Sequence, residues 1–125
     1  MGNKASKNTV NLDTASRLDV ICRRGDTFSL VLDFNQGMPV DGWRMEVREN
    51  DTDDSGSPTI ASTDFSFVVD AGAVALSKLT ITATSSTMAG VNSGLYVYDL
   101  QNTSNGVVKT YLYGTFKINE DVTIA

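Results

Sequence analysis

Histidine is missing from this chain of 125 residues, and cysteine occurs once, at position 22. Without an imidazole there is no Ser-His-Asp or Cys-His catalysis, no histidine-bearing zinc site and no histidine acid-base chemistry. No pair of carboxyl groups stands out as a glycosidase pair either. A lone cysteine excludes an internal disulfide, and Cys22 is expected to be a small buried apolar residue. We therefore expect a protein that is not an enzyme and needs no cofactor or metal.

Long apolar runs and an excess of positive charge are missing as well. No run approaches the roughly 18 apolar residues that a membrane-spanning helix needs, and the first residues lack the apolar core of a secretory signal. Ten Lys and Arg against fifteen Asp and Glu give a net charge of −5, and the cations are scattered. Nucleic-acid binding draws on clustered cations. The composition therefore indicates neither nucleic acid nor a membrane as a partner.

What is present is the composition of one ordinary globular domain. The chain is 41% apolar and 20% charged, and it is long enough for a real core but not for two. Residues 1–16 are polar and show no periodicity, so we expect an extended N-terminal arm there. Residues 17–125 are then the folded domain.

Alternating apolar and polar residues between Gly, Asn, Asp and Ser turns predict about seven strands. The first six are expected at residues 18–22, 27–34, 43–49, 64–70, 79–83 and 94–101, and the seventh follows Gly106. Residues 85–89 predict one turn of helix, ended by Gly90. Trp43, aligned with Met45 and Val47, is expected in the core. The expected fold is all-β, an antiparallel sandwich of two sheets.

The last two strands are predicted to form a hairpin. The pair Asn105-Gly106 suits a type I′ turn, in which both central residues have positive φ. The strand before it is apolar on both faces, which is typical of a strand covered on two sides. After it, the inward residues are expected to be Val108, Leu112, Phe116 and Ile118. The outward row would be Lys109, Tyr111, Tyr113, Thr115 and Lys117. Exposed tyrosines favour a protein contact, although a neighbouring strand or loop could equally cover them.

This hairpin also carries a family resemblance. The stretch G-L-Y-V-Y-D-L-Q, a short N-G turn and T-Y-L-Y-G-T-F-K-I ending in D-V-T resembles the C-terminal half of small immunoglobulin-like proteins of tailed-bacteriophage virions. The upstream runs R-G-D-T-F-S-L-V-L-D-F and W-R-M-E-V-R-E fit the first half of that pattern. The resemblance spans residues 18–123, and its motifs are turn glycines, a tyrosine-rich strand and a closing strand. It implies an immunoglobulin-like fold.

The same resemblance implies a non-enzymatic structural protein of the virion. A single domain without a fibre or coiled-coil extension favours an auxiliary (decoration) capsid protein, and a tail, baseplate or collar adaptor is the alternative. The implied partners are the major capsid protein or tail proteins, with a homo-oligomer in the particle also open. Candidate partner-binding residues are Lys4, Lys7, Val10 and Leu12 in the arm and Lys109, Tyr111, Tyr113 and Lys117 in the hairpin.

Other motifs leave a contrasting class open, a calcium- or membrane-binding module. The first residues, M-G-N-K-A-S-K, match the N-myristoylation pattern. Residues 51–56, D-T-D-D-S-G, open like a calcium loop, but Ser62 occupies the position of the bidentate Glu. Arg24-Gly25-Asp26 spells an integrin tripeptide, for which we expect a plain turn instead. A further alternative is a carbohydrate-binding sandwich in which Trp43 would stack on sugar.

Overall fold

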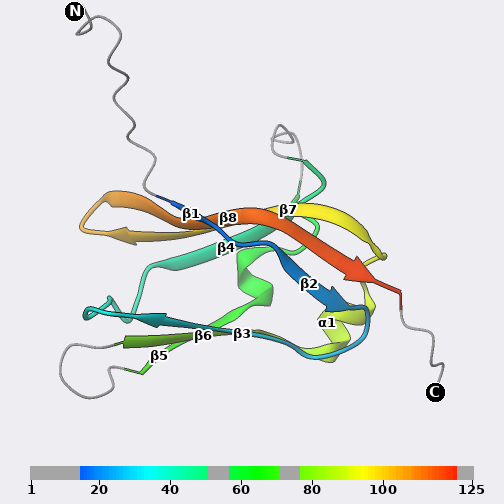
Figure 1. Cartoon of the computed structure of the whole chain (residues 1–125), viewed down its shortest axis with the longest axis horizontal. Coiled ribbons are helices and arrows are strands. Elements are labelled where there is room, and N and C mark those ends of the chain that lie inside the picture. Colours follow the sequence, from blue (N-terminus) through cyan, green and yellow to red (C-terminus); the bar gives the residue numbers. More distant parts are fainter. Residues whose placement is uncertain (1–14, 51–56, 71–76, 121–125) are drawn as a thin grey trace, which may run out of the picture.

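The computed structural model describes residues 15–50, 57–70 and 77–120. They form two β-sheets that face one another, with the short helix α1 at one end (Figure 1). The larger sheet has the order β1-β8-β7-β4, with β2 also paired to β8, and the smaller sheet has the order β3-β6-β5. The predicted all-β sandwich is confirmed. The element bounds are β1 Ser16–Arg17, β2 Val20–Arg23, β3 Phe28–Phe34, β4 Trp43–Arg48, β5 Ser66–Asp70, β6 Ser77–Ala83, α1 Ser85–Ala89, β7 Gly94–Ser104 and β8 Val107–Asn119.

The core lies between the sheets and is built from the predicted alternating positions. Met45 and Val47 of β4 and Leu79 and Ile81 of β6 have no solvent exposure. Phe28 links the two layers, because its ring lies 5.9 Å from Phe65 and 5.2 Å from Phe116. Burying such side chains contributes roughly 1.5–3 kcal/mol each. The remaining fully buried side chains among the described residues are Ile60, Met88, Leu100, Phe116 and Ile118.

The first strand differs from the prediction in two ways. It is divided into β1 and β2 by a kink at Leu18 and Asp19, and both pieces pair parallel with β8. The expectation of antiparallel pairing throughout was therefore wrong at this edge. The reason is topological, because the chain enters the domain along the free edge of its own last strand and runs in the same direction.

Helix α1 and Tyr96 lie where the chain crosses from β6 of the smaller sheet to β7 of the larger sheet. The predicted helical turn is present, and Thr84 caps it by accepting a hydrogen bond from the Thr87 N–H at 3.2 Å. Gly90 ends the helix with φ of −80°, so the left-handed cap that glycine often supplies is not used here. The Tyr96 hydroxyl donates to the Asn92 carbonyl oxygen at 2.7 Å. This is the tyrosine corner that characterises immunoglobulin-like sandwiches.

The hairpin of β7 and β8 is confirmed, and its turn has φ of 51° at Asn105 and 78° at Gly106. One prediction for β7 was wrong. Leu95 is 65% exposed, so β7 is covered on one face only among the described residues. The apolar outward residues of β7 belong to an open sheet surface.

A bulge in β8 corrects the predicted faces of the hairpin. Leu100 pairs with Leu112, but Gln101 pairs with Thr110, so Tyr111 is an additional residue in β8. The alternation changes sides there, and Val108, expected inside, is 58% exposed. Tyr111, expected outside, is instead partly buried against the core.

Candidate functional site

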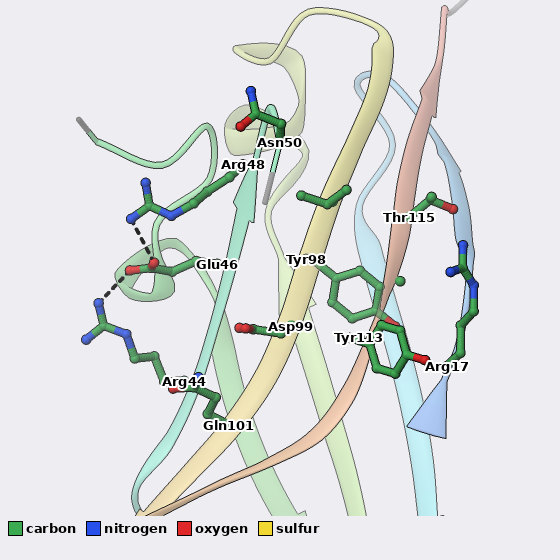
Figure 2. Close-up of a pocket in the computed structure, with 12 residues that line it drawn as sticks. Arg17, Arg44, Glu46, Arg48, Asn50, Tyr98, Asp99, Gln101, Tyr113 and Thr115 are labelled. Atoms are coloured by element: carbon green, nitrogen blue, oxygen red, sulfur yellow. Dashed lines mark hydrogen bonds and ion pairs between the residues drawn. The ribbon is translucent and has the colours of Figure 1, made fainter. Parts of the chain in front are cut away.

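The outward face of the larger sheet contains an open hollow of about 560 Å³ (Figure 2). Its floor consists of the shorter outward side chains of β7 and β8, which are Val97, Asp99 and Thr115. Longer side chains rise on both sides, from β4 and from β1 with Tyr113. Because side chains alternate along a strand, the hollow follows from short residues between long ones on one pleated face. Its lining residues are Arg17, Arg44, Glu46, Arg48, Asn50, Val97, Tyr98, Asp99, Gln101, Tyr113, Gly114 and Thr115.

One wall of the hollow is an ion-pair triad on β4. Arg44 and Arg48 flank Glu46 and donate to its two carboxylate oxygens at 2.5 and 3.0 Å (Figure 2). Burial opposes ionisation of Glu46, but the hydrogen bonds from Arg44 and Arg48 outweigh it and hold the pKa below its ordinary value. Glu46 therefore stays ionised to a lower pH than an ordinary glutamate, and the wall stays charged with it. Arg44 keeps further N–H donors beyond the one bound to Glu46.

Asp99 is the unusual group of the hollow. It is the direct cross-strand neighbour of Glu46 on one side and Tyr113 on the other. Burial, followed by repulsion from Glu46, raises the pKa of this carboxyl. No described residue donates a hydrogen bond to the Asp99 side chain. The charges of Arg44 and Arg48 lower its pKa, but by less than burial and Glu46 raise it. A half-buried carboxylate without a donor is a ready acceptor for a ligand.

The opposite wall is fixed by contacts at the kink between β1 and β2. The Asp19 carboxylate accepts hydrogen bonds from the Thr115 N–H and hydroxyl, both at 3.0 Å, and pairs with Arg17 at 3.2 Å. The bonds from Thr115, then that from Arg17, lower the pKa of Asp19. Leu18 lies so close to β8 that a Cβ on Gly114 would be 2.4 Å from the Leu18 oxygen. This packing places Arg17 beside Tyr113.

The predicted partner-binding row of the hairpin is divided between two faces. Tyr111 lies inside, with its ring 5.4 Å from Trp43 and 5.9 Å from Phe34. Lys109 lies over the same ring, with its Nζ 4.9 Å from the centre of the Tyr111 ring. The alternative that neighbouring elements cover the tyrosines is thus correct for Tyr111.

The other two residues of that row lie on the outward face. Tyr113 is 38% exposed and borders the hollow. Lys117 lies between the exposed side chains of Ile21 and Leu95. The candidate residues of the arm, Lys4, Lys7, Val10 and Leu12, lie outside the described residues.

Two of the alternative motifs have a structural explanation. Trp43 is 8% exposed and its indole N–H donates to the Pro39 carbonyl oxygen at 2.8 Å, which confirms the predicted core tryptophan and leaves no free face for a sugar. Gly25 has φ of 87° in the predicted turn. The Arg24 guanidinium beside it is engaged by the Ala89 carbonyl oxygen and Glu120.

The calcium-loop residues 51–56 lie outside the described part of the chain. Within the described ranges no three acidic or cysteine side chains come together as a metal site. The helices described in the structure include none that is long and apolar enough to cross a membrane.

Sequence reasoning placed Arg44, Glu46 and Arg48 in solvent but did not find the hollow. Alternation alone gives the outward face of each strand. The pairing of Asp99 with Glu46 and Tyr113 depends on the strand register, which local pattern does not determine. An acidic residue within the apolar strand 94–101 was the available signal.

Comparisons with known proteins support the fold only. No protein-family model matches the chain, and no curated protein matches it in sequence. Among solved structures, a family 123 glycoside hydrolase from Clostridium perfringens is similar, with a TM-score of 0.50 and 11% sequence identity. The likeness covers 92% of this chain and 24% of the hydrolase, so the chain spans about a quarter of that enzyme's length. At this identity it shows a shared β-fold and assigns no reaction to the chain.

Proposed function

We propose that the chain is a non-enzymatic structural protein of a tailed-bacteriophage virion, and specifically an auxiliary protein bound to the outside of the capsid. The sequence motifs of the hairpin motivate the class, and the tyrosine corner at Tyr96 agrees with the immunoglobulin-like fold that the class implies. A tail, baseplate or collar adaptor is the second candidate. Both functions need binding surfaces and no reacting groups.

The observation that carries a binding role is a group of three exposed apolar residues, Val40, Val107 and Val108, at one end of the sandwich. Val107 and Val108, at the tip of the hairpin, are 67% and 58% exposed. Val40 is also exposed, and its loop is joined to β7, since the Asn102 amide donates to the Asp41 carbonyl oxygen at 3.0 Å. Exposed apolar side chains of this size at one end favour a protein contact.

The chain enters the domain beside the half of β8 that lies toward the hairpin tip. Ser16 pairs with Leu112, upstream of the middle of β8, whereas the strand ends at Asn119 at the opposite end (Figure 1). The arm, with the candidate contacts Lys4, Lys7, Val10 and Leu12, is therefore joined to the domain on the hairpin-tip side of the middle of β8. Arm and tip can engage one partner surface together, and this gives a tethered contact a high effective concentration.

Copy number in purified particles tests the proposal. Quantitative mass spectrometry against the major capsid protein should find the chain in hundreds of copies if it decorates the shell. A dozen or so copies would favour the tail or baseplate alternative. Absence from particles would overturn the virion assignment altogether.

A pair of matched variants tests the surface. Val108→Asp at the tip should abolish or strongly reduce incorporation into particles, because a charge would replace an apolar contact. Val68→Asp is the control, since Val68 is equally exposed at 61% but lies on the outer face of the smaller sheet. Equal incorporation of the two variants, both folded by circular dichroism, would exclude the hairpin tip as the contact.

A further inference from the structure

We propose that the hollow on the larger sheet binds a neutral oligosaccharide, laid along β7 between the β4 wall and Tyr113. This site is separate from the hairpin tip and does not depend on the virion assignment. Three features of the hollow favour such a ligand: its shape, the balance of its charges, and Asp99, a carboxylate to which no described residue donates a hydrogen bond.

The shape suits a linear ligand. The hollow extends along β7 past its outward residues Val97, Asp99 and Gln101, and its walls run beside that strand on β4 and on β8 with β1 (Figure 2). The four residue steps from Val97 to Gln101 span about 13 Å, which is enough for a few linked sugar rings. A compact ion would contact only a part of such a groove.

The charges favour a neutral ligand over an ion. Arg17 is paired with Asp19, and both Arg44 and Arg48 are paired with Glu46, which leaves Asp99 as the remaining carboxylate. An anion entering the groove would meet Asp99 and Glu46, and a cation would meet the two arginines of β4. A sugar hydroxyl both donates and accepts hydrogen bonds, so it can donate one to a carboxylate and accept one from a guanidinium. Neither wall opposes it.

Asp99 and Tyr113 supply the two contacts that a sugar ring needs. The Asp99 carboxylate has acceptor capacity for two hydroxyl donors and receives none from the described residues. Tyr113, directly opposite on β8, offers a partly exposed ring against which the C–H face of a sugar can pack. Hydrogen bonds to a half-buried carboxylate are stronger than those between neutral groups, so Asp99 is the expected anchor.

The test is a titration of the ¹⁵N-labelled chain followed by NMR. Maltohexaose, cellohexaose, xylohexaose and N-acetylchitohexaose are added separately to about 10 mM, which detects dissociation constants in the millimolar range. At least one sugar should shift the amides of Val97, Asp99, Gln101 and Thr115 and leave those of β3, β5 and β6 unchanged. The affinity should not change between low and high salt, because a neutral ligand is not screened.

Variants connect the shifts to the groove. Asp99→Ala and Tyr113→Ala should each weaken binding roughly tenfold, the equivalent of one lost contact of about 1.4 kcal/mol. Tyr113→Phe keeps the ring and should bind as the parent does. Lys117→Ala, on the same sheet face but outside the hollow, should also bind normally.

Three outcomes would overturn the proposal. The first is the absence of shifts in the groove with these sugars and with a broad array of neutral glycans. The second is binding that falls steeply with salt, which would indicate a charged ligand or a protein segment. The third is binding that survives both alanine variants while their melting temperatures stay at the parent value.

Discussion

The Tyr98 hydroxyl donates a 2.6 Å hydrogen bond to the carbonyl oxygen of Leu18, a residue 80 positions earlier in the chain. Leu18 lies at the kink between β1 and β2, and Tyr98 projects from the middle of β7 into the core. Its ring also packs edge-on against Phe116 at 6.0 Å. The hydrogen bond therefore joins the entering segment to β7, and the ring contact joins Tyr98 to β8.

Tyr98→Phe should lower the free energy of unfolding by about 1 kcal/mol, because the Leu18 oxygen loses a donor in a partly buried setting. Urea denaturation followed by fluorescence measures the change. Tyr113→Phe is the control, since the structure shows no hydrogen bond from the Tyr113 hydroxyl to a described residue. Equal stabilities of the two variants would show that the bond to Leu18 contributes nothing.

The free energy of unfolding should fall at alkaline pH because Tyr98 ionises there. Burial, and then the Asp19 charge, raise the pKa of Tyr98 from 10.0 to about 12. The folded state thus favours the neutral phenol, so its stabilising contribution is complete below pH 10 and is lost as the pH rises toward 12. Melting temperatures measured across this range should decline less in Tyr98→Phe than in the parent. Parallel declines would argue against Tyr98 as the group responsible.

Gly114→Ala should destabilise the fold by roughly 1–3 kcal/mol, the usual cost of forcing an added methyl into a packed site. The new Cβ would lie 2.4 Å from the Leu18 oxygen and 2.9 Å from its carbon, and both are backbone atoms that cannot rotate away. Thermal melting gives the readout. Gly37→Ala is the matched control, because nothing lies within 4 Å of that Cβ and its melting temperature should be unchanged.

Asp99→Asn should raise the melting temperature at pH 7 and leave it nearly unchanged at pH 3. The pKa of Asp99 is raised in the folded state, so folding favours its protonated form. The contribution of Asp99 to the stability of the fold is therefore fully present below its ordinary pKa of 3.8, and it is lost as the pH rises through its pKa in the folded state. Asparagine removes that loss and the repulsion from Glu46. An Asp99→Asn variant that is less stable than the parent at pH 7 would contradict this explanation.

Gly106→Ala should cost roughly 1–2 kcal/mol for a conformational reason alone. Gly106 has φ of 78°, and no atom lies within 4 Å of the Cβ that alanine would add. The left-handed conformation itself is unfavourable for a residue with a Cβ. Asn105→Gly, at the other positive-φ position of the turn, should be neutral or slightly stabilising in the same denaturation experiment.

Short-range pattern predicted much of this fold because the signals were local. Two-residue alternation identified β3, β4, β5 and β6 with their inward faces, and the requirement for positive φ identified the turn at Asn105 and Gly106. It failed at Tyr111, where one additional residue in β8 reverses the alternation. Nothing in the local run of residues signals a bulge, since its position depends on the pairing with β7.

The candidate site, like the fold, was predictable from local pattern only in part. Alternation correctly turned Arg44, Glu46 and Arg48 outward and placed Trp43 in the core, so the amino-acid sequence by itself determined the chemical character of each strand face. Only the tertiary structure decided that Asp99 lies between Glu46 and Tyr113, that Tyr111 is covered while Tyr113 borders the hollow, and that β1 and β2 run parallel to β8. Periodicity is a property of neighbouring residues, whereas register and strand order arise from packing between segments far apart in the chain.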